Sequence, residues 1–173
     1  MFKLCYTFNE DSDFMNNYEK IVKFLSEKEK TISTMESCTG GFLASSITNI
    51  DNSSSIFKYG AVTYSNEYKE KMGVSKEVIE KYTVYSKETA KEMSRAITDF
   101  TSSNYGIGIT GQINKQDPNN PYGSVGEVFI SIYDKDKNMF YEYAINTDKN
   151  TREENKIVIC DFTIEKLLEI ISM

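Results

Sequence analysis

Short runs of β-branched and apolar residues alternate with longer helical patterns along the sequence, and this alternation limits the fold more than any other feature. It is typical of a sheet whose two faces are covered by helices. The last two β-type runs are separated only by the charged turn 135–138, so we expect them to form a hairpin. The pattern predicts an α/β fold, a three-layer α/β/α domain with a mixed, mostly parallel sheet.

The expected strands cover residues 31–35, 56–64, 105–111, 125–134 and 139–146, and the expected helices cover residues 13–28, 41–50, 75–82, 86–102 and 151–172. The helix 86–102 starts at a Ser86 cap and places four apolar side chains on one face, which we expect in the core: Ala90, Met93, Ile97 and Phe100. The last helix starts with a capping box formed by Thr151 and Glu154.

The protein has 173 residues, a length that fits one domain over 1–173, with 1–10 as a possible N-terminal arm. No apolar run approaches the ~20 residues that a membrane span needs, and the acidic N-terminus does not resemble a signal peptide. We therefore expect a cytoplasmic protein with no membrane partner. A formal net charge of −6 opposes nucleic-acid binding, because binding to phosphates depends on clustered Lys and Arg.

No histidine occurs in the sequence, and this absence excludes Ser-His-Asp triads, Cys-His dyads and every His-ligated metal centre. The three cysteines are widely spaced, which favours free thiols over a disulfide framework or a metal site. We therefore expect no metal. Any general base must come from Lys, Asp, Glu, Tyr or an unusual thiolate.

The stretch Glu36-Ser37-Cys38-Thr39-Gly40-Gly41 lies between an expected strand and an expected helix. A loop in this position offers free backbone N–H groups and the positive end of a helix dipole to a ligand. Glycines let the backbone approach an oxyanion, and Ser37, Cys38 or Thr39 has the chemistry of a nucleophile. The alternative is a helix cap followed by a turn, and spacing alone favours that simpler interpretation.

Three other segments carry candidate groups, each with a simpler structural explanation. Lys69 follows Tyr64 just beyond the second strand and is a plausible base if it is partly desolvated, although an exposed helical lysine is the commoner case. Residues 108–111 either wrap a ligand or mark close packing of the backbone. Arg152 opens the last helix, where an arginine meets a phosphate or simply faces solvent.

In order along the sequence, these segments resemble the CinA carboxy-terminal domain family of nicotinamide-nucleotide amidohydrolases. The matching motifs are E-S-C-T-G-G at 36–41, G-x-V-x-Y-S-N-x-x-K at 60–69 followed by M-G-V at 72–74, S-x-x-T-A at 86–90, G-I-T-G at 108–111, V-G-x-V at 125–128, and Arg152. The sequence departs from the family pattern in the loop after Gly111, where "QINKQDPNNPYGSVG" replaces an A-G-P and glycine-rich sequence.

The resemblance implies hydrolysis of the carboxamide of nicotinamide mononucleotide to nicotinate mononucleotide and ammonia, in pyridine nucleotide salvage and without a cofactor. It assigns the nucleophile to Ser37 and the assisting groups to Lys69 and Tyr64, with Cys38 as the rival nucleophile and backbone N–H groups of 38–41 as oxyanion donors. It places the following residues at the substrate: Glu36, Cys38, Thr39, Gly40, Gly41, Asn66, Thr110, Gly111 and Arg152.

The resemblance also implies a stand-alone deamidase module that forms a homo-oligomer, with the aromatic-rich hairpin around 129–143 as a possible interface. The altered loop after Gly111 leaves a second function open. That alternative is a catalytically weak relative that binds a nucleotide or a protein and has a regulatory, competence-related role.

Overall fold

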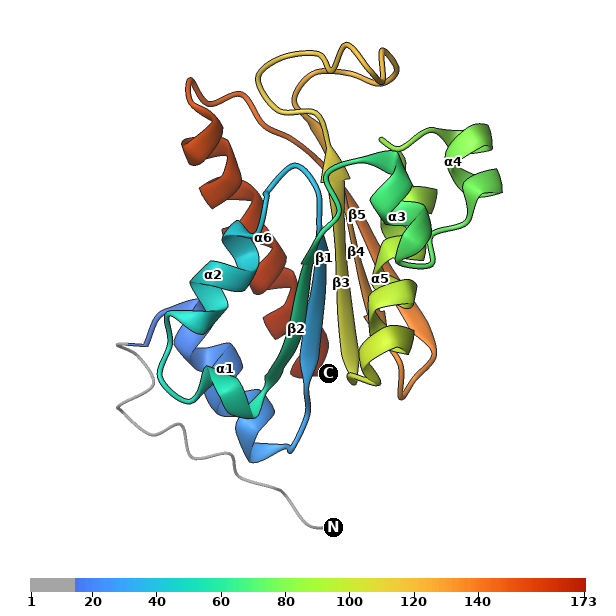
Figure 1. The fold of residues 1–173 in the computed structure, drawn as a ribbon. Helices are drawn as coiled ribbons and strands as arrows, with labels where there is room; N and C mark the ends of the chain where they lie inside the picture. Colours follow the sequence, from blue (N-terminus) through green and yellow to red (C-terminus); the bar gives the residue numbers. More distant parts are fainter. Residues whose placement is uncertain (1–14) are drawn as a thin grey trace.

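A computed structural model describes residues 15–173, which form a five-stranded sheet with the strand order β2-β1-β3-β4-β5 (Figure 1). β1 pairs in parallel with β2 and β3, whereas β3–β4 and β4–β5 are antiparallel pairs. Four strands therefore run in one direction and β4 runs against them. The strands are β1 (Ile32–Glu36), β2 (Phe57–Val62), β3 (Tyr105–Gly111), β4 (Glu127–Asp134) and β5 (Met139–Asn146).

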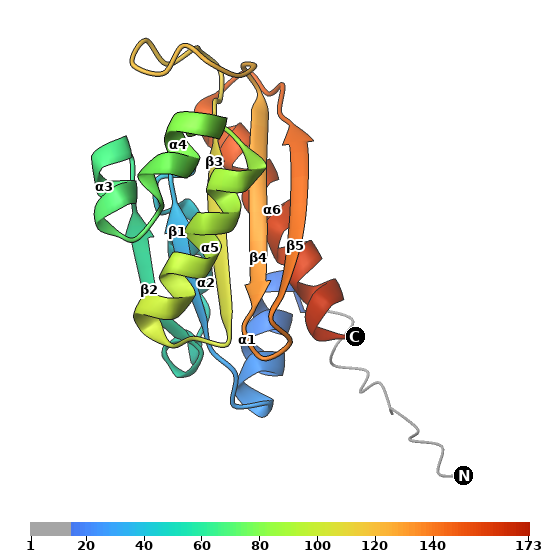
Figure 2. The same cartoon turned by 90° about the vertical axis from the view of Figure 1, so that its right-hand side faces the viewer.

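Helices cover both faces of this sheet, so the predicted three-layer α/β/α architecture with a mixed sheet is confirmed. α1, α2 and α6 lie on one face, and α5 lies on the other with α3 and α4 beside it (Figures 1 and 2). The helices are α1 (Asn17–Glu27), α2 (Phe42–Thr48), α3 (Asn66–Lys71), α4 (Lys76–Tyr82), α5 (Lys87–Thr101) and α6 (Arg152–Ile171), with a 3₁₀ turn η2 (Ser53–Ser55).

The larger hydrophobic core lies between the sheet and the layer of α1, α2 and α6. It is built on aliphatic side chains such as Leu25, Ile107 and Ile164, all of which are completely buried. On the opposite face α5 lies very close to β3. A Cβ atom at Gly108 would collide with the backbone of Ala90 and Ser94, so this position needs a glycine. The glycines of the 105–111 strand are thus explained in part by close helix–sheet packing.

Helix caps and strand bounds follow the sequence closely. Ser86 caps α5 through the Thr89 N–H, and the capping box of Thr151 and Glu154 starts α6. β3 and β5 have the predicted bounds, and the other shared elements differ by a few residues at their ends. The first expected helix begins later, at Asn17, with Asn16 as its cap. The N-terminal arm (1–10) lies outside the described residues.

Two expectations about local structure are wrong. The segment after β2, where no helix was among the expected ones, forms the short helix α3, which Ser65 caps through the Tyr68 N–H. Phe100 does not join the core of α5: its side chain is 66% exposed and its ring lies 5.6 Å from the ring of Tyr59. Phe100 occupies the last turn of α5, where the helix has passed the edge of its core cluster.

The aromatic side chains of the β4–β5 hairpin pack within the molecule. Tyr133 stacks on Phe140 with ring centroids 4.4 Å apart, and Tyr143 packs edge-on against Phe162 of α6 at 5.7 Å. Tyr133, Phe140 and Tyr143 thus make aromatic contacts within the molecule, and the use of the hairpin as an interface stays a prediction. No helix within residues 15–173 is both long and apolar enough to cross a membrane.

Candidate active site

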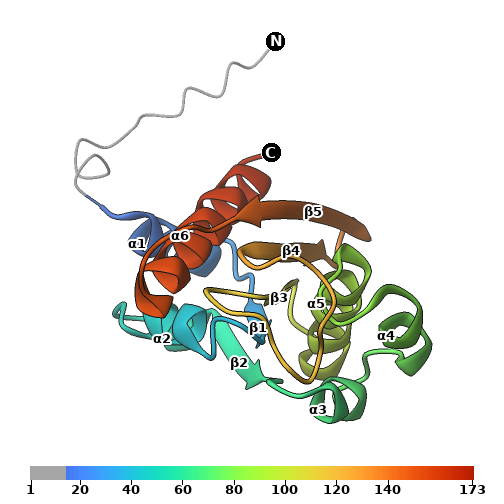
Figure 3. The same cartoon turned by 90° about the horizontal axis from the view of Figure 1, so that it is seen from above.

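A pocket of about 500 Å³ lies beyond the carboxyl ends of the parallel strands β1, β2 and β3. Its walls come from the loop after β1, the start of α3, the segment before α5, the long loop 112–126 and the start of α6. Figure 3 shows the sheet from this side, with the 112–126 loop crossing above the strand ends. Ligands bind at this edge of open α/β sheets, and the volume suits a small molecule.

Ser37 and Lys69 form a direct pair at the base of this pocket. The Nζ of Lys69 lies 3.0 Å from the Oγ of Ser37 and donates to the backbone carbonyl oxygen of Thr63 at 2.7 Å. Ser37 follows the last residue of β1, and Lys69 reaches it from α3, which the Ser65 cap starts three residues after β2. Ser37 lines the pocket, whereas Lys69 lies behind it and is only 2% exposed.

Burial changes the acid–base behaviour of Lys69. Desolvation of the ammonium lowers the pKa of Lys69 to about 8, while Cys38 and Asp117 oppose that shift. A lysine with this pKa is partly neutral near pH 7, and the Thr63 carbonyl holds one of its N–H groups. The amine therefore has a lone pair available for the Ser37 proton, and the alternative of a solvated surface lysine does not apply to Lys69.

Cys38 has the opposite character. Its side chain is 4% exposed and belongs to the larger hydrophobic core, and desolvation raises the pKa of its thiol to about 12. A thiol in that state supplies almost no thiolate at neutral pH, although the thiolate is the reactive form. The geometry therefore favours Ser37 over Cys38 as the nucleophile.

Glu36 acts on the helix that follows the loop. Its carboxylate is 1% exposed and accepts backbone N–H groups from Gly41 at 3.1 Å, Leu43 at 3.1 Å and Ala44 at 2.9 Å. These donors lie at the N-terminus of α2, where Gly41 itself provides no side-chain cap. The Glu36 carboxylate therefore pairs with N–H groups at the N-terminus of α2. The sequence had suggested this helix end as a binding site for an anionic ligand.

The backbone N–H groups of the loop divide into used and unused donors. Gly40 N–H donates to the Ser37 carbonyl at 3.1 Å, and Gly41 N–H is taken by Glu36. The N–H groups of Cys38 and Thr39 have no acceptor among residues 15–173. Of the N–H groups of 38–41 that were expected to bind an oxyanion, only those of the two residues directly after Ser37 are thus left without an acceptor.

Tyr64 and Arg152 meet at the mouth of the pocket. An Nη2 of Arg152 lies 3.4 Å from the Tyr64 hydroxyl, and its Nη1 donates to the carbonyl oxygen of Ile113 at 2.8 Å. Tyr64 is 67% exposed, and its hydroxyl makes no hydrogen bond with Ser37 or Lys69. In this structure Tyr64 lines the pocket beside the Ser–Lys pair without contacting it.

The loop 112–126 contributes pocket residues that sequence reasoning did not single out. The Asp117 carboxylate accepts the Tyr85 hydroxyl at 2.7 Å and the Asn120 amide at 2.8 Å, and Asn66 of α3 donates to Asn120 Oδ1 at 2.9 Å. This series of contacts joins the loop to α3 and to the segment before α5. The only signal in the sequence was the departure of this loop from the family pattern.

The structure brings together part of the predicted site. Ser37, Cys38, Tyr64, Asn66, Gly111 and Arg152 line the pocket, with Lys69 directly behind Ser37. The other predicted substrate contacts do not line it: Glu36, Thr39, Gly40, Gly41 and Thr110. Thr110 is completely buried, and its hydroxyl donates to the carbonyl oxygen of Val84 at 2.7 Å.

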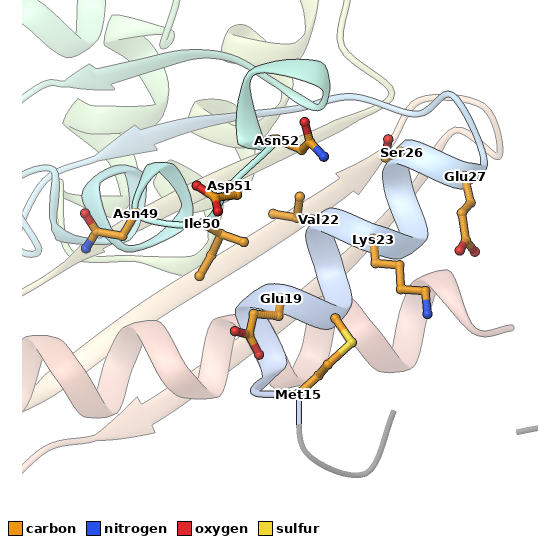
Figure 4. Close-up of a pocket in the computed structure, with 10 residues that line it drawn as sticks. All are labelled: Met15, Glu19, Val22, Lys23, Ser26, Glu27, Asn49, Ile50, Asp51 and Asn52. Atoms are coloured by element: carbon orange, nitrogen blue, oxygen red, sulfur yellow. The ribbon is translucent and has the colours of Figure 1, made fainter. Parts of the chain in front are cut away.

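A second cavity of about 530 Å³ lies between α1 and the segment 49–52 that follows α2 (Figure 4). Val22 and Ile50 face each other there, and the rim carries charged side chains such as Glu19 and Lys23. None of the predicted site residues lines this cavity, so we assign the site to the pocket above Ser37. Within residues 15–173 no cluster of His, Cys, Asp or Glu has the composition of a metal site.

Fold and site together define a three-layer α/β protein with a buried Ser–Lys pair at the carboxyl edge of its parallel strands. The sequence profile described as CinA C-terminal domain matches residues 15–171. The chain therefore belongs to the CinA C-terminal domain family.

Sequence relatives agree with this membership. A CinA-like protein of Kosmotoga olearia is 36% identical over 155 residues, which are 37% of that protein and 88% of this chain. A CinA-like protein of Endomicrobium trichonymphae is 37% identical over 34% of its own length and 84% of this chain. The chain thus spans about a third of the length of these relatives.

Two solved structures share the fold at lower sequence identity. The competence/damage inducible protein of Agrobacterium tumefaciens superposes with a TM-score of 0.81 at 24% identity, covering 98% of that protein and 92% of this one. A CinA superfamily protein of Escherichia coli gives a TM-score of 0.81 at 23% identity, covering 94% of that protein and 95% of this one.

Proposed function

We propose that this protein is an amidohydrolase that cleaves the carboxamide of nicotinamide mononucleotide, releasing nicotinate mononucleotide and ammonia. The observation that carries the proposal is the 3.0 Å contact between the Nζ of a buried Lys69 and the Oγ of Ser37. A Ser–Lys pair performs acyl transfer without histidine. The substrate is the one implied by resemblance to the amidohydrolases of this family.

In the first half of the reaction, neutral Lys69 accepts the hydroxyl proton of Ser37 while the Oγ attacks the amide carbon. The tetrahedral intermediate collapses when the C–N bond breaks, and protonated Lys69 gives its proton to the departing nitrogen, which leaves as ammonia. Ser37 then carries an acyl ester. The lowered pKa of Lys69, about 8, suits both the acceptance and the return of this proton.

In the second half, water attacks the ester carbonyl while Lys69 accepts a proton from the water. Collapse of the second tetrahedral intermediate breaks the C–Oγ bond, and Lys69 returns the proton to Ser37. The product is the carboxylic acid, and the enzyme is back in its starting state. No step requires a metal, a redox cofactor or a second protein.

Two groups of the pocket have further roles in this proposal. The N–H group of Cys38, which has no acceptor among residues 15–173 and belongs to a residue that lines the pocket, would receive the oxyanion, and one such donor is worth about 3 to 4 kcal/mol of transition-state stabilisation in other acyl-transfer enzymes. Arg152 makes no salt bridge within residues 15–173, so its charge is available for the substrate phosphate. Tyr64 is oriented by Arg152 beside the pocket.

Release of ammonia from nicotinamide mononucleotide tests the proposal directly. We expect turnover by the unmodified protein and none by Ser37→Ala, with nicotinate mononucleotide formed in equal amount to ammonia. No ammonia from the unmodified protein at high concentration would refute the amidohydrolase.

The altered loop favours a second candidate, a nucleotide- or protein-binding regulatory module. The loop 112–126 presents Lys115, Asp117 and Asn120 to the pocket in place of a glycine-rich sequence. The names of the solved relatives refer to competence or damage induction. Binding of the nucleotide without hydrolysis would favour this candidate. Self-association stays a prediction, which size-exclusion chromatography with light scattering tests.

A further inference from the structure

The Asp117 carboxylate is held in one orientation inside the pocket. Its Oδ2 accepts the Tyr85 hydroxyl at 2.7 Å and the Asn120 side-chain amide at 2.8 Å, and its Oδ1 accepts the backbone N–H of Asn119 at 2.9 Å. Hydrogen bonds from Asn120 and Tyr85 lower the pKa of Asp117, so the group is an anion at neutral pH. The carboxylate is therefore a fixed negative charge on the pocket wall.

No lysine or arginine within residues 15–173 forms a salt bridge with Asp117. Lys115 and Arg152 line the same pocket, and neither is paired with an acidic side chain within the described part of the protein. Arg152 is instead anchored on the Ile113 carbonyl. Within the described residues, the pocket therefore presents one acidic group, Asp117, and two basic groups, Lys115 and Arg152, that form no salt bridge with one another.

The orientation of Asp117 leaves part of its accepting capacity unused. A carboxylate has about four lone-pair sites, and the three protein donors occupy both sites of Oδ2 and one of Oδ1. A half-buried carboxylate interacts favourably with a ligand group that donates a hydrogen bond, and unfavourably with one that is negatively charged. Charge repulsion from Asp117 therefore disfavours a phosphate at this wall of the pocket.

Among the groups of the proposed substrate, only the carboxamide N–H₂ and the ribose hydroxyls donate hydrogen bonds. In the proposed reaction the carboxamide lies at Ser37, and the phosphate is drawn to the cationic side chains. The ribose lies between these two ends of the molecule. Asp117 is the only carboxylate among the described residues that line the pocket, and a carboxylate is the strongest side-chain acceptor there for these hydroxyls.

We propose that Asp117 is a specificity-determining residue that accepts a hydrogen bond from a ribose hydroxyl of the nucleotide. This inference rests on the proposed function for the identity of the ligand. The contact of Asn120 with Asn66 ties the loop that carries Asp117 to α3, the helix that also carries Lys69. The loop that would contact the ribose and the lysine of the Ser–Lys pair are therefore connected through α3.

Binding to a variant that cannot turn over separates recognition from chemistry. We would measure dissociation constants by calorimetry for Ser37→Ala with nicotinamide mononucleotide, its 2′-deoxy and 3′-deoxy analogues, and nicotinate mononucleotide. The same set is measured with Ser37→Ala/Asp117→Asn, which keeps the side-chain shape and removes the charge. A hydrogen bond to a charged group predicts that one deoxy analogue binds about tenfold or more weakly to Ser37→Ala.

With Asp117→Asn added, that discrimination between the nucleotide and its deoxy analogue should fall to within about twofold. Tyr85→Phe in the Ser37→Ala background is the matched control, because it removes one orienting donor and keeps the carboxylate; it should preserve most of the discrimination. Thermal denaturation of each variant verifies that the pocket is folded.

Equal discrimination with and without Asp117, or none in Ser37→Ala, overturns the inference. A loss on Asp117→Asn that affects the amide but not the acid product overturns it too, because it assigns the carboxylate to the carboxamide N–H₂. Failure of the proposed function is a separate result, namely no ammonia from the unmodified protein although Ser37→Ala binds the nucleotide. If none of these ligands binds, both the proposed function and the role of Asp117 are refuted.

Discussion

The Glu36 carboxylate accepts the backbone N–H of Ala44 at 2.9 Å, so the residue before Ser37 caps the helix that begins after the loop. Together with the N–H groups of Gly41 and Leu43, this contact ties both ends of the Ser37 loop to one buried carboxylate. A helix terminus otherwise leaves such donors unpaired. Glu36 thus fixes the loop without touching the pocket.

Replacement of Glu36 by Ala should therefore reduce both stability and turnover. Three N–H groups, one buried and two partly buried, lose a charged acceptor, which we expect to lower the free energy of unfolding by about 2 to 4 kcal/mol. Glu36→Gln should cost less because one amide oxygen still accepts. Urea denaturation measures the effect, with Glu70→Ala on exposed α3 surface as a control expected within about 0.5 kcal/mol. Equal stability of Glu36→Ala and Glu70→Ala would contradict the capping role.

Replacement of Lys69 by Met should abolish turnover and leave the fold intact. Methionine fills a similar volume at a site that is 2% exposed, and it removes an amine whose charged form is disfavoured by burial. We expect kcat to fall by at least about 10³-fold, as for loss of a general base and nucleophile activator. Ammonia release measures this. Lys71→Met, on exposed α3 surface, is the control and should keep normal turnover; normal turnover by Lys69→Met would remove Lys69 from the mechanism.

The buried Lys69 should also make the free energy of unfolding depend on pH in the alkaline range. The pKa of Lys69 is 10.5 in the unfolded reference and about 8 in the fold. Between these values the unfolded protein binds more protons, so the free energy of unfolding should rise with pH from 8 to 10.5, by about 3 kcal/mol in total. Denaturation at pH 7 and pH 9.5 measures the slope. Its Lys69-dependent part should vanish in Lys69→Met, and an unchanged slope would show that Lys69 does not titrate in this range.

The activity should follow the protonation of Lys69 as well. Because the proposed mechanism uses the neutral amine of Lys69 as the base, kcat/KM is expected to fall about tenfold per pH unit below pH 8 and to level off above it. The Cys38 thiol does not contribute, since burial raises its pKa to about 12. Initial rates between pH 6 and 9.5 measure the profile. A profile that is flat through pH 8 would argue against Lys69 as the base.

Ser37→Ala and Cys38→Ala should separate the two candidate nucleophiles. We expect Ser37→Ala to lower kcat by about 10⁴-fold or more, whereas Cys38→Ala should keep activity and lose about 1 kcal/mol of stability from the core. Steady-state kinetics and thermal denaturation measure both effects. Turnover by Ser37→Ala together with loss of turnover in Cys38→Ala would reverse the assignment.

Much of the fold could be predicted because its signals are local. β3 and β5 have strong strand patterns bounded by polar turns, and Ser86 and Thr151 are caps that act on residues three positions away. The helix α3 was missed because six residues, Asn66–Lys71, are too short to show a periodic apolar face. Phe100 was misplaced because periodicity does not show where a helix leaves its core.

The candidate site was predictable in its residue types more than in its contacts. The absence of histidine left Lys, Asp, Glu, Tyr or a thiolate as the base, and only the resemblance to the family implied Ser37 with Lys69, because nothing near Lys69 in the sequence distinguishes it from Lys71. The two lysines differ in the structure, where Lys69 is 2% exposed and the side chain of Lys71 is 58% exposed. That difference depends on how α3 packs against the sheet.

The sequence by itself thus determined the alternation of strands and helices, the caps and the kinds of chemistry open to a histidine-free protein, because these depend on composition or on neighbours within a few residues. Tertiary structure alone decided that Lys69 is desolvated beside Ser37, that Glu36 serves α2 instead of a ligand, and that Asp117 faces the pocket. Each of these depends on contact or burial between segments far apart in the sequence, since solvation and through-space distance are set by packing and not by sequence order.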